Sequence, residues 1–288
     1  MPTDHAIVNG ELMPLCDARI SVLDLGFMRG LAVFETLRTY GGLPHALGAH
    51  LERLARSCAG IDIAMPFAES DLRAELERAH RAVGAPELRL NLFATPGTHR
   101  EGVFGADGPT TVIIAKALSE PPAERYTHGV AVVTFSGQRY APQIKTTTYI
   151  TGRRGIAAAA RRGAEEALYV DEQGHVSEGV TSNVLALFDR TVISPAHNAL
   201  QGITREHIKH IVGELGLAWR DGELTPADLH RADELWITSS VRELMPVIRV
   251  DDTPIGDGRP GPLAQRIRER YRAACLRDAA ADAERSGG

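Results

Sequence analysis

Residues 144–205, with the sequence IKTTTYITGRRGIAAAARRGAEEALYVDEQGHVSEGVTSNVLALFDRTVISPAHNALQGITR, carry the most informative patterns of the chain. The chain has 32 lysines and arginines, but only three of them are lysines, at positions 116, 145 and 209. Arginine keeps its proton, whereas a lysine removed from water can become a neutral, nucleophilic amine. Lys145 is therefore a candidate nucleophile, and a lysine left on the surface is the alternative.

The residues after Lys145 predict a helix followed by a hairpin. An alanine-rich helix is expected at about 152–163, a strand at 166–171 and a return strand at 175–178. Glu178 then lies at the end of a hairpin strand, close to the apolar run 184–188. A carboxylate that is buried there needs a cationic or N–H partner. An ordinary capped glutamate at the edge of a sheet is the alternative.

The segment LQGITR at 200–205 opens a predicted helix. Its apolar residues Ile208, Ile211, Val212 and Leu215 fall on one face. The free N–H groups and positive dipole of a helix N-terminus can hold a phosphate, and Gly202 allows close approach of the backbone. Most helices begin in a similar way without binding an anion, so this signal gains weight only from its neighbours.

In this order, the motifs resemble those of the fold-type IV pyridoxal-phosphate enzymes, which include D-amino-acid transaminases, branched-chain transaminases and aminodeoxychorismate lyases. The matching segments are KTTTY from Lys145, EEALYVDEQG at 165–174, VSEGVTSN at 176–183 and LQGITR at 200–205. The resemblance extends over nearly the whole chain. The ordered series of motifs makes it specific.

The resemblance implies an α+β fold with two domains, a small N-terminal α/β domain and a larger, β-barrel-like domain with helices. The segment SEPPAE at 119–124 contains two prolines and charges without apolar periodicity, which is typical of a linker. We therefore expect the small domain at 1–118 and the larger, cofactor-binding domain at 125–288. A chain of 288 residues is long enough for two such cores.

The resemblance also implies roles for particular residues toward pyridoxal 5′-phosphate. Lys145 would be the catalytic residue, which binds the cofactor and then moves the substrate proton, and Glu178 would keep the pyridine nitrogen protonated. In HLERL at 50–54, Arg53 would contact the phosphate. The other implied cofactor contacts are Tyr149 at the phenolic oxygen, Leu200 on the ring face, Ile203 and Thr204 through backbone N–H groups, and Ser239 and Ser240 at the phosphate.

Substrate binding is expected from two segments. The glycine-rich loop TPGTHREGVFGADGP at 95–109 is long, and such loops often bind ligands. Resemblance to the D-amino-acid transaminases implies that His99 and Arg100 in this loop hold the substrate carboxylate. Arg29, in LDLGFMRG, stands where many branched-chain enzymes have a tyrosine. It would hold a carboxylate through two hydrogen bonds, or form a salt bridge at the surface.

Composition excludes several other classes of protein. The net charge of −5 argues against a nucleic-acid partner or an acidic membrane surface. The three cysteines, Cys16, Cys58 and Cys275, have no metal-ligand spacing and predict free thiols. Neither a signal peptide nor an apolar run of membrane-spanning length is evident. We expect a cytoplasmic protein with no metal site, and the resemblance implies a homodimer.

The expected activity is transfer of an amino group between an amino acid and a 2-oxo acid such as 2-oxoglutarate. Branched-chain enzymes usually have Gly-Thr-Ala where this chain has Ser239-Ser240-Val241, and the lyases usually have Lys-x-Leu-Asn-Arg where it has KTTTY. Both departures favour a D-amino acid such as D-alanine as substrate. A branched-chain L-amino-acid aminotransferase is the first alternative and an aminodeoxychorismate lyase the second. A cofactor-binding protein without catalysis is a third, against which Lys145 and Glu178 argue.

Overall fold

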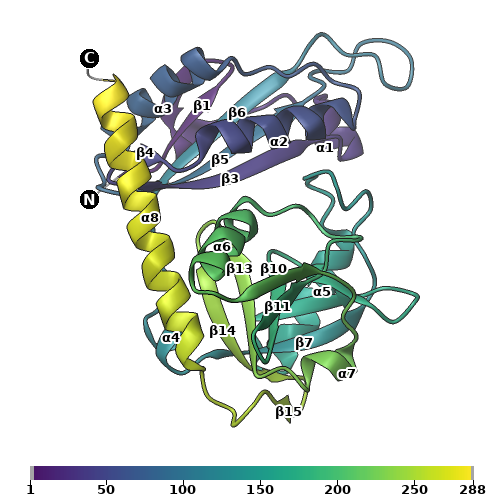
Figure 1. Cartoon of the computed structure of the whole chain (residues 1–288). Coiled ribbons are helices and arrows are strands. Elements are labelled where there is room, and N and C mark those ends of the chain that lie inside the picture. The colour runs from purple at the N-terminus through teal and green to yellow at the C-terminus, as the bar shows by residue number, and fades with distance from the viewer. Residues whose placement is uncertain (1–2, 287–288) are drawn as a thin grey trace. The chain divides into compact units, whose positions relative to one another are not determined.

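The computed structural model describes the backbone of residues 3–286 and the burial of residues 3–281. The chain divides into two compact units. Unit 1 contains Met1–Ser119, Ile144–Thr148 and Cys275–Gly288, and unit 2 contains Glu120–Gln143 and Tyr149–Ala274. The fold is mixed α+β, as expected from the sequence (Figure 1).

The two units differ from the predicted domains by two segments. Ile144–Thr148 belongs to unit 1 because its backbone pairs with the segment 32–34, as the bonds from Phe34 N to Lys145 O (2.9 Å) and from Thr147 N to Ala32 O (3.0 Å) show. The sequence also predicts a terminal helix at 261–274, and the last helix of the structure, α8 (Pro262–Ser286), continues past that range. Its alanine-rich continuation favours further helix, and from Cys275 onward it is part of unit 1.

Unit 1 is built on a six-stranded antiparallel sheet in the order β2-β1-β6-β5-β3-β4. An Asn-Gly pair between short apolar runs predicts a hairpin at 6–14 with its turn at Asn9-Gly10. The structure confirms it, because Val8 pairs with Glu11 and both turn residues have positive φ. The strands are β1 (His5–Val8), β2 (Glu11–Pro14), β3 (Val33–Tyr40), β4 (Leu43–Pro44), β5 (Leu88–Thr95) and β6 (Thr110–Ala117).

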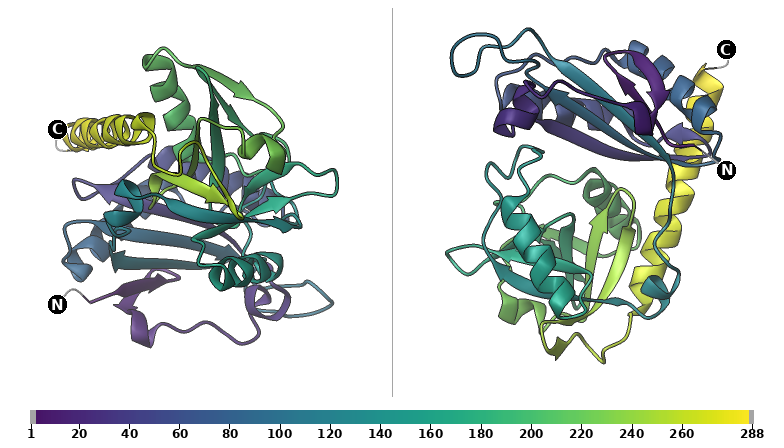
Figure 2. Two further views of the ribbon diagram at one scale, coloured as in Figure 1. Left: turned by 90° about the horizontal axis from the view of Figure 1, so that it is seen from below. Right: turned by 180° about the vertical axis from the view of Figure 1, so that it is seen from behind.

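The sequence predicts helices at 47–59, where Leu47, Leu51, Leu54 and Cys58 follow helical spacing, and at 69–83. Helices α2 (Leu47–Ala59) and α3 (Glu69–Val83) have these bounds and cover one face of the sheet (Figure 1). Their apolar stripes and the inner face of the sheet form one core, which includes Leu54 and Leu72. Short helices η1 (Leu15–Asp17) and α1 (Leu25–Arg29) precede β3. The loop between β5 and β6 projects from the unit (Figure 2).

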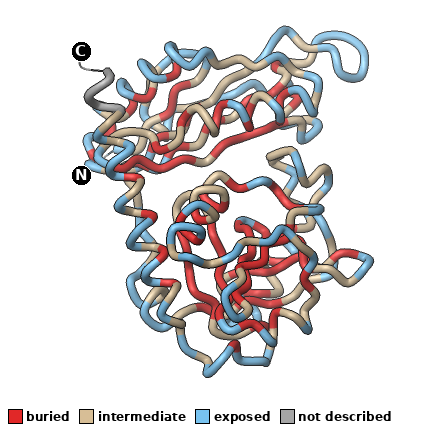
Figure 3. The backbone as a smooth tube through the Cα atoms, in the orientation of Figure 1, coloured by how far each residue is buried: buried red, intermediate tan, exposed pale blue. Residues whose placement is uncertain are grey.

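Unit 2 is built on a mixed nine-stranded sheet in the order β12-β11-β10-β13-β14-β7-β8-β9, with β15 paired to β14. The sheet curves into a half-barrel, and buried residues follow its central strands (Figure 3). The strands are β7 (Val130–Ser136), β8 (Glu166–Val170), β9 (Val176–Gly179), β10 (Asn183–Phe188), β11 (Thr191–Ser194), β12 (Ala218–Asp221), β13 (Glu234–Ser239), β14 (Glu243–Val250) and β15 (Thr253–Pro254).

The remaining helices connect and cover the strands of unit 2. Helix α5 packs its glycine and alanine face on β7 and β8, where Gly155 lies against Ala167 and Phe135. These helices are α4 (Glu124–Thr127), α5 (Ile150–Arg161), α6 (Ile203–Glu214) and α7 (Pro226–Leu229). Among the described residues, no helix combines the length and apolar character needed to cross a membrane. Nor does any group of three or more His, Cys, Asp or Glu side chains within that range form a metal site.

Truncation of the unit 1 core should cost stability. The Leu54 side chain is fully buried, so Leu54→Ala removes apolar contacts and leaves a cavity, at an expected cost of about 2–5 kcal/mol. Leu23 is half exposed, so Leu23→Ala should change stability by less than about 0.5 kcal/mol. Urea unfolding of both variants checks this. Equal costs would contradict the packing described for α2.

Candidate active site

Lys145 lies in unit 1, where its backbone is hydrogen-bonded to both a helix and a strand. Its N–H donates to Ser57 Oγ on α2 (3.1 Å), and its carbonyl accepts from Phe34 N at the start of β3 (2.9 Å). Its Nζ lies 4.6 Å from the centroid of the Phe34 ring, within cation–π range. The side chain is half-buried. The segment is therefore held in place on both sides of the candidate nucleophile.

Next to this segment, unit 1 contains a buried cluster of charged groups. Glu35 is fully buried on β3, and one of its oxygens accepts from Arg53 Nε (2.8 Å) and the other from Arg53 Nη2 (2.6 Å). His50 Nδ1 lies 2.8 Å from Glu35 Oε2. The structure thus places Arg53, expected at the cofactor phosphate, in a bidentate pair with Glu35.

The protonation states of this cluster follow from burial and charge. Burial alone would raise the pKa of Glu35, but the Arg53 charge and the bonds from Arg53 and His50 outweigh it and lower that pKa to about 2. Burial lowers the pKa of His50, and the nearby Arg53 and Lys145 charges act in the same direction. We therefore assign a neutral His50 that donates its Nδ1–H to a charged Glu35.

The predicted substrate-binding residues of unit 1 lie at its surface. Arg29 is exposed at the C-terminal end of α1. His99 Nε2 lies 2.7 Å from Gly102 O, and Arg100 forms an exposed ion pair with Asp107 (2.6 Å). The backbone of this loop is bonded to the α1 segment, since His99 N donates to Leu23 O (2.9 Å).

In unit 2, Glu178 is buried with the two kinds of partner that a buried carboxylate needs. Its Oε1 forms an ion pair with Arg139 Nε at 2.7 Å, and its Oε2 accepts from Leu200 N at 2.9 Å. Glu178 is 4% exposed. The structure therefore brings Glu178 and Leu200 together, as expected, and adds Arg139.

Tyr149 lies in the same part of unit 2. It is the N-cap residue of α5, and its ring packs with Val180, two residues after Glu178. Burial raises the pKa of the Tyr149 hydroxyl, on which the charges of Arg139 and Glu178 also act. Tyr149 therefore keeps its proton at neutral pH and can donate a hydrogen bond.

Leu200 and Asn183 connect Glu178 to the start of α6, since Leu200 N donates to Glu178. Asn183 Nδ2 donates to Leu200 O (2.8 Å), and a Cβ atom at Gly202 would lie only 1.9 Å from Asn183 Oδ1. Only glycine allows this approach. Gly202 is the N-cap of α6, and no side chain among the described residues hydrogen-bonds at that cap. The first N–H groups of Ile203 and Thr204 therefore have no side-chain acceptor from the cap residue.

Ser239 and Ser240 lie at the end of β13, beside Thr238, which pairs with Asn183 of β10. Ser239 Oγ accepts from Arg242 N (3.4 Å), so its own hydrogen can be donated elsewhere. The serine hydroxyls thus lie at the end of the strand next to the one that carries Asn183. Unit 2 collects the expected phosphate donors of α6 and β13 around Asn183.

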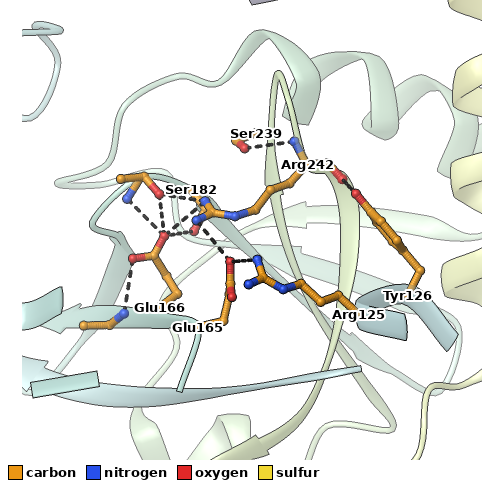
Figure 4. A network of polar contacts seen from close by, with 9 residues as sticks. Arg125, Tyr126, Glu165, Glu166, Ser182, Ser239 and Arg242 are labelled. Carbon is orange, nitrogen blue, oxygen red and sulfur yellow. Dashed lines mark hydrogen bonds and ion pairs between the residues drawn. The ribbon is translucent and has the colours of Figure 1, made fainter. Parts of the chain in front are cut away.

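An ion-pair network supports the turn that follows Ser240 (Figure 4). Arg242 Nη1 donates to Thr181 Oγ1 (2.6 Å) and to Glu166 Oε2 (3.3 Å), and Glu166 is fully buried. Glu166 also accepts from Thr181 Oγ1 and N and from Ser182 Oγ. Arg242 therefore joins the turn after β13 to the loop that follows Glu178.

Several of these residues were missed by the sequence analysis. Glu35, Arg139, Asn183 and Arg242 have partners 15 to 76 residues away, and no periodicity or spacing indicates such pairs. Glu35 had one local signal, since it precedes the HLERL helix in a strand that alternates poorly. An acidic residue between apolar neighbours, as in Phe34-Glu35, indicates a partner if the strand is buried.

Loss of the Arg242 guanidinium should destabilise the protein. Arg242→Met would leave the buried Glu166 without that cation, at an expected cost of about 1–3 kcal/mol in the free energy of unfolding. Glu166→Gln in the same chain should recover at least half of this loss. The exposed pair of Arg231 is the control, since Arg231→Met should cost less than about 0.5 kcal/mol. Additive losses in the double variant would contradict the pairing.

Low pH should lower the stability of unit 1, because Glu35 becomes protonated. Its pKa is about 2 in the folded state and near 4.5 in the unfolded chain, so its stabilising contribution is complete above pH 4.5 and is lost as pH falls toward 2. The contribution amounts to about 3 kcal/mol. Urea unfolding at pH 3, 4, 5 and 7 should therefore show a flatter profile for Glu35→Gln than for the unaltered chain. Parallel profiles would refute this contribution.

Comparison with known proteins shows the family to which the chain belongs. The sequence pattern of the family described as amino-transferase class IV matches residues 32–250. A D-alanine aminotransferase of Bacillus licheniformis is 28% identical over 282 residues, which cover 95% of this chain and 98% of the relative. A putative branched-chain-amino-acid aminotransferase of Methanocaldococcus jannaschii is 27% identical, with coverage of 92% and 94%.

A solved structure points to the same family. A branched-chain amino acid aminotransferase crystallised with pyridoxamine 5′-phosphate superposes with a TM-score of 0.89 at 28% identity, covering 96% of this chain and 95% of the other. Aminotransferases of class IV use pyridoxal 5′-phosphate as cofactor. The chain belongs to this family and is a pyridoxal-phosphate-dependent class IV aminotransferase.

Proposed function

We propose that the enzyme moves the amino group of a D-amino acid such as D-alanine to a 2-oxo acid such as 2-oxoglutarate. Ser239-Ser240-Val241 in place of Gly-Thr-Ala, KTTTY after position 144 and the similarity to D-alanine aminotransferases support this substrate class. A branched-chain L-amino acid is the second candidate, which the similarity to the solved branched-chain enzyme favours.

The observation that carries the proposal is the set of donors and acceptors in unit 2. A buried carboxylate, Glu178, suits a protonated ring nitrogen, and its ion pair with Arg139 and its hydrogen bond from Leu200 N hold it in place. The α6 N-terminus and the hydroxyls of Ser239 and Ser240 suit a dianionic phosphate. Pyridoxal phosphate therefore fits these residues, and when bound it supplies an electron sink for the substrate carbon.

The other residues take the following roles in the proposal. Leu200 would pack on the ring face, Ile203 and Thr204 would hold the phosphate through N–H groups, and Tyr149 would donate to the phenolic oxygen. In unit 1, Arg53 would bind the phosphate with its planar fork. Lys145 would bind the cofactor covalently through Nζ. Once the substrate amino group has displaced it, the freed Nζ amine would carry the proton taken from the substrate carbon.

Substrate recognition is proposed for Arg29, His99 and Arg100. Arg100 would exchange Asp107 for the substrate carboxylate, which costs little because the present pair is exposed. We further propose that the enzyme is a cytoplasmic homodimer. The exposed apolar side chains Val22, Phe27, Val103 and Phe104 in unit 1 support an association of this kind.

The visible absorption spectrum tests the proposal. The purified enzyme should show a yellow band that D-alanine bleaches and L-leucine does not, and Lys145→Ala should lack both the band and turnover. Bleaching by L-leucine alone would move the assignment to the branched-chain enzymes. A band that neither amino acid changes would favour the lyase, and full activity of Lys145→Ala would refute the role of this lysine.

A further inference from the structure

Glu35 makes no contact that the proposed reaction requires, yet it is among the most fully enclosed charges of unit 1. Its two oxygens together accept three hydrogen bonds, two from Arg53 and one from His50. The side chain of Glu35 is 0% exposed, and that of Arg53 is 6% exposed. Because burial of a charge is costly, a carboxylate retained at this position calls for an explanation beyond packing.

The two bonds from Arg53 determine the orientation of its guanidinium, and the bond from His50 helps to hold the carboxylate. Arginine has a long side chain with about 2 kcal/mol of rotamer entropy, and a bidentate carboxylate fixes both the position and the plane of its fork. Glu35 bonds the Nε and Nη2 side of that fork. The direction in which the rest of the guanidinium points is therefore set by Glu35.

The same carboxylate joins α2 to β3 where Lys145 is anchored. His50, Arg53 and Ser57 follow one another on a single face of α2, and Ser57 accepts the Lys145 N–H. On β3, the residue before Glu35 is Phe34, whose N–H donates to the Lys145 carbonyl. The Glu35 bonds thus cross from strand to helix beside both anchors of the lysine segment.

We propose that Glu35 is a positioning residue for the cofactor. By binding Nε and Nη2 of Arg53, it directs the guanidinium to the cofactor phosphate. The inference rests on the proposed role of Arg53. Glutamine at this position would offer one acceptor oxygen, and its NH₂ group would meet a donor of Arg53 or His50. The fork would have to move, although the size of the side chain is unchanged.

If Glu35 acted only through its charge, its neutralisation would have the opposite effect on phosphate binding. Because Glu35 is negative, its neutralisation would then strengthen binding of the phosphate dianion. If it acts by orienting Arg53, its neutralisation weakens that binding. A bidentate, charge-assisted contact that is lost corresponds to about 10- to 100-fold in affinity.

The test compares two cofactor forms on the full-length enzyme after removal of its cofactor. Pyridoxal and pyridoxal phosphate differ only in the phosphate. The Kd of pyridoxal divided by the Kd of pyridoxal phosphate therefore isolates the phosphate contact from the bond to Lys145. Glu35→Gln should lower this ratio about 10- to 100-fold. Glu35→Asp keeps the charge but cannot span the same partners, and it should lower the ratio as well. An unchanged or increased ratio in Glu35→Gln would overturn the proposal.

The matched control is Glu87→Gln. Glu87 also lies in unit 1 and accepts from Thr39 and from the N–H groups of Gly41 and Gly42, but not from Arg53 or His50. This variant should leave the ratio unchanged. Thermal unfolding and circular dichroism of each cofactor-free variant would show whether it is folded.

Variants of Arg53 separate this inference from the proposed function. Arg53→Met should lower the ratio, and Glu35→Gln added to Arg53→Met should lower it no further, because Glu35 acts through the guanidinium. The double variant contains no unpaired buried charge, which favours its folding. An unchanged ratio in Arg53→Met would refute the phosphate role of Arg53. If Arg53→Met lowers the ratio but Glu35→Gln leaves it unchanged, only the positioning role of Glu35 is refuted.

Discussion

Compensation of buried negative charge organises both units of this protein. Among the described residues, four buried glutamates are paired with arginines from other elements. These pairs are Glu35 with Arg53, Glu166 with Arg242, Glu178 with Arg139, and Glu243 with Arg268 and Arg272. Each ion would be strongly unfavourable in the interior without its partner. The positions of the partnered elements are constrained accordingly.

This constraint explains the unusual use of cations in the chain. Arginine has a planar fork that bonds both oxygens of a carboxylate and is more weakly hydrated than an ammonium group, so it suits buried pairs. A composition with 29 arginines and three lysines agrees with that use. Lys145 differs from the buried arginines in its surroundings, since its ammonium lies over the Phe34 ring in a half-buried position.

The ion pairs also connect structure to chemistry. In unit 2, Arg139 and Leu200 N hold the Glu178 side chain in place, and Arg242 supports the turn that contains Ser240. In unit 1, Glu35 holds Arg53 beside the anchors of Lys145. A class IV aminotransferase needs a proton-moving lysine, a charged partner for the ring nitrogen and donors for the phosphate. The residues proposed for these roles are held by contacts between elements far apart in the sequence.

The sequence by itself determined the family, the α+β class, the bounds of α2 and α3 and the Asn9-Gly10 hairpin. Apolar periodicity and turn residues act over a few positions, so they can be read locally. Lys145 and Glu178 could be proposed as site residues in the same way, because they stand in motifs of several adjacent residues. Only the tertiary structure decided that residues 144–148 join β3 and that Glu35, Arg139 and Arg242 complete their clusters. Those outcomes depend on pairing between groups 15 to 115 residues apart, which no local pattern encodes.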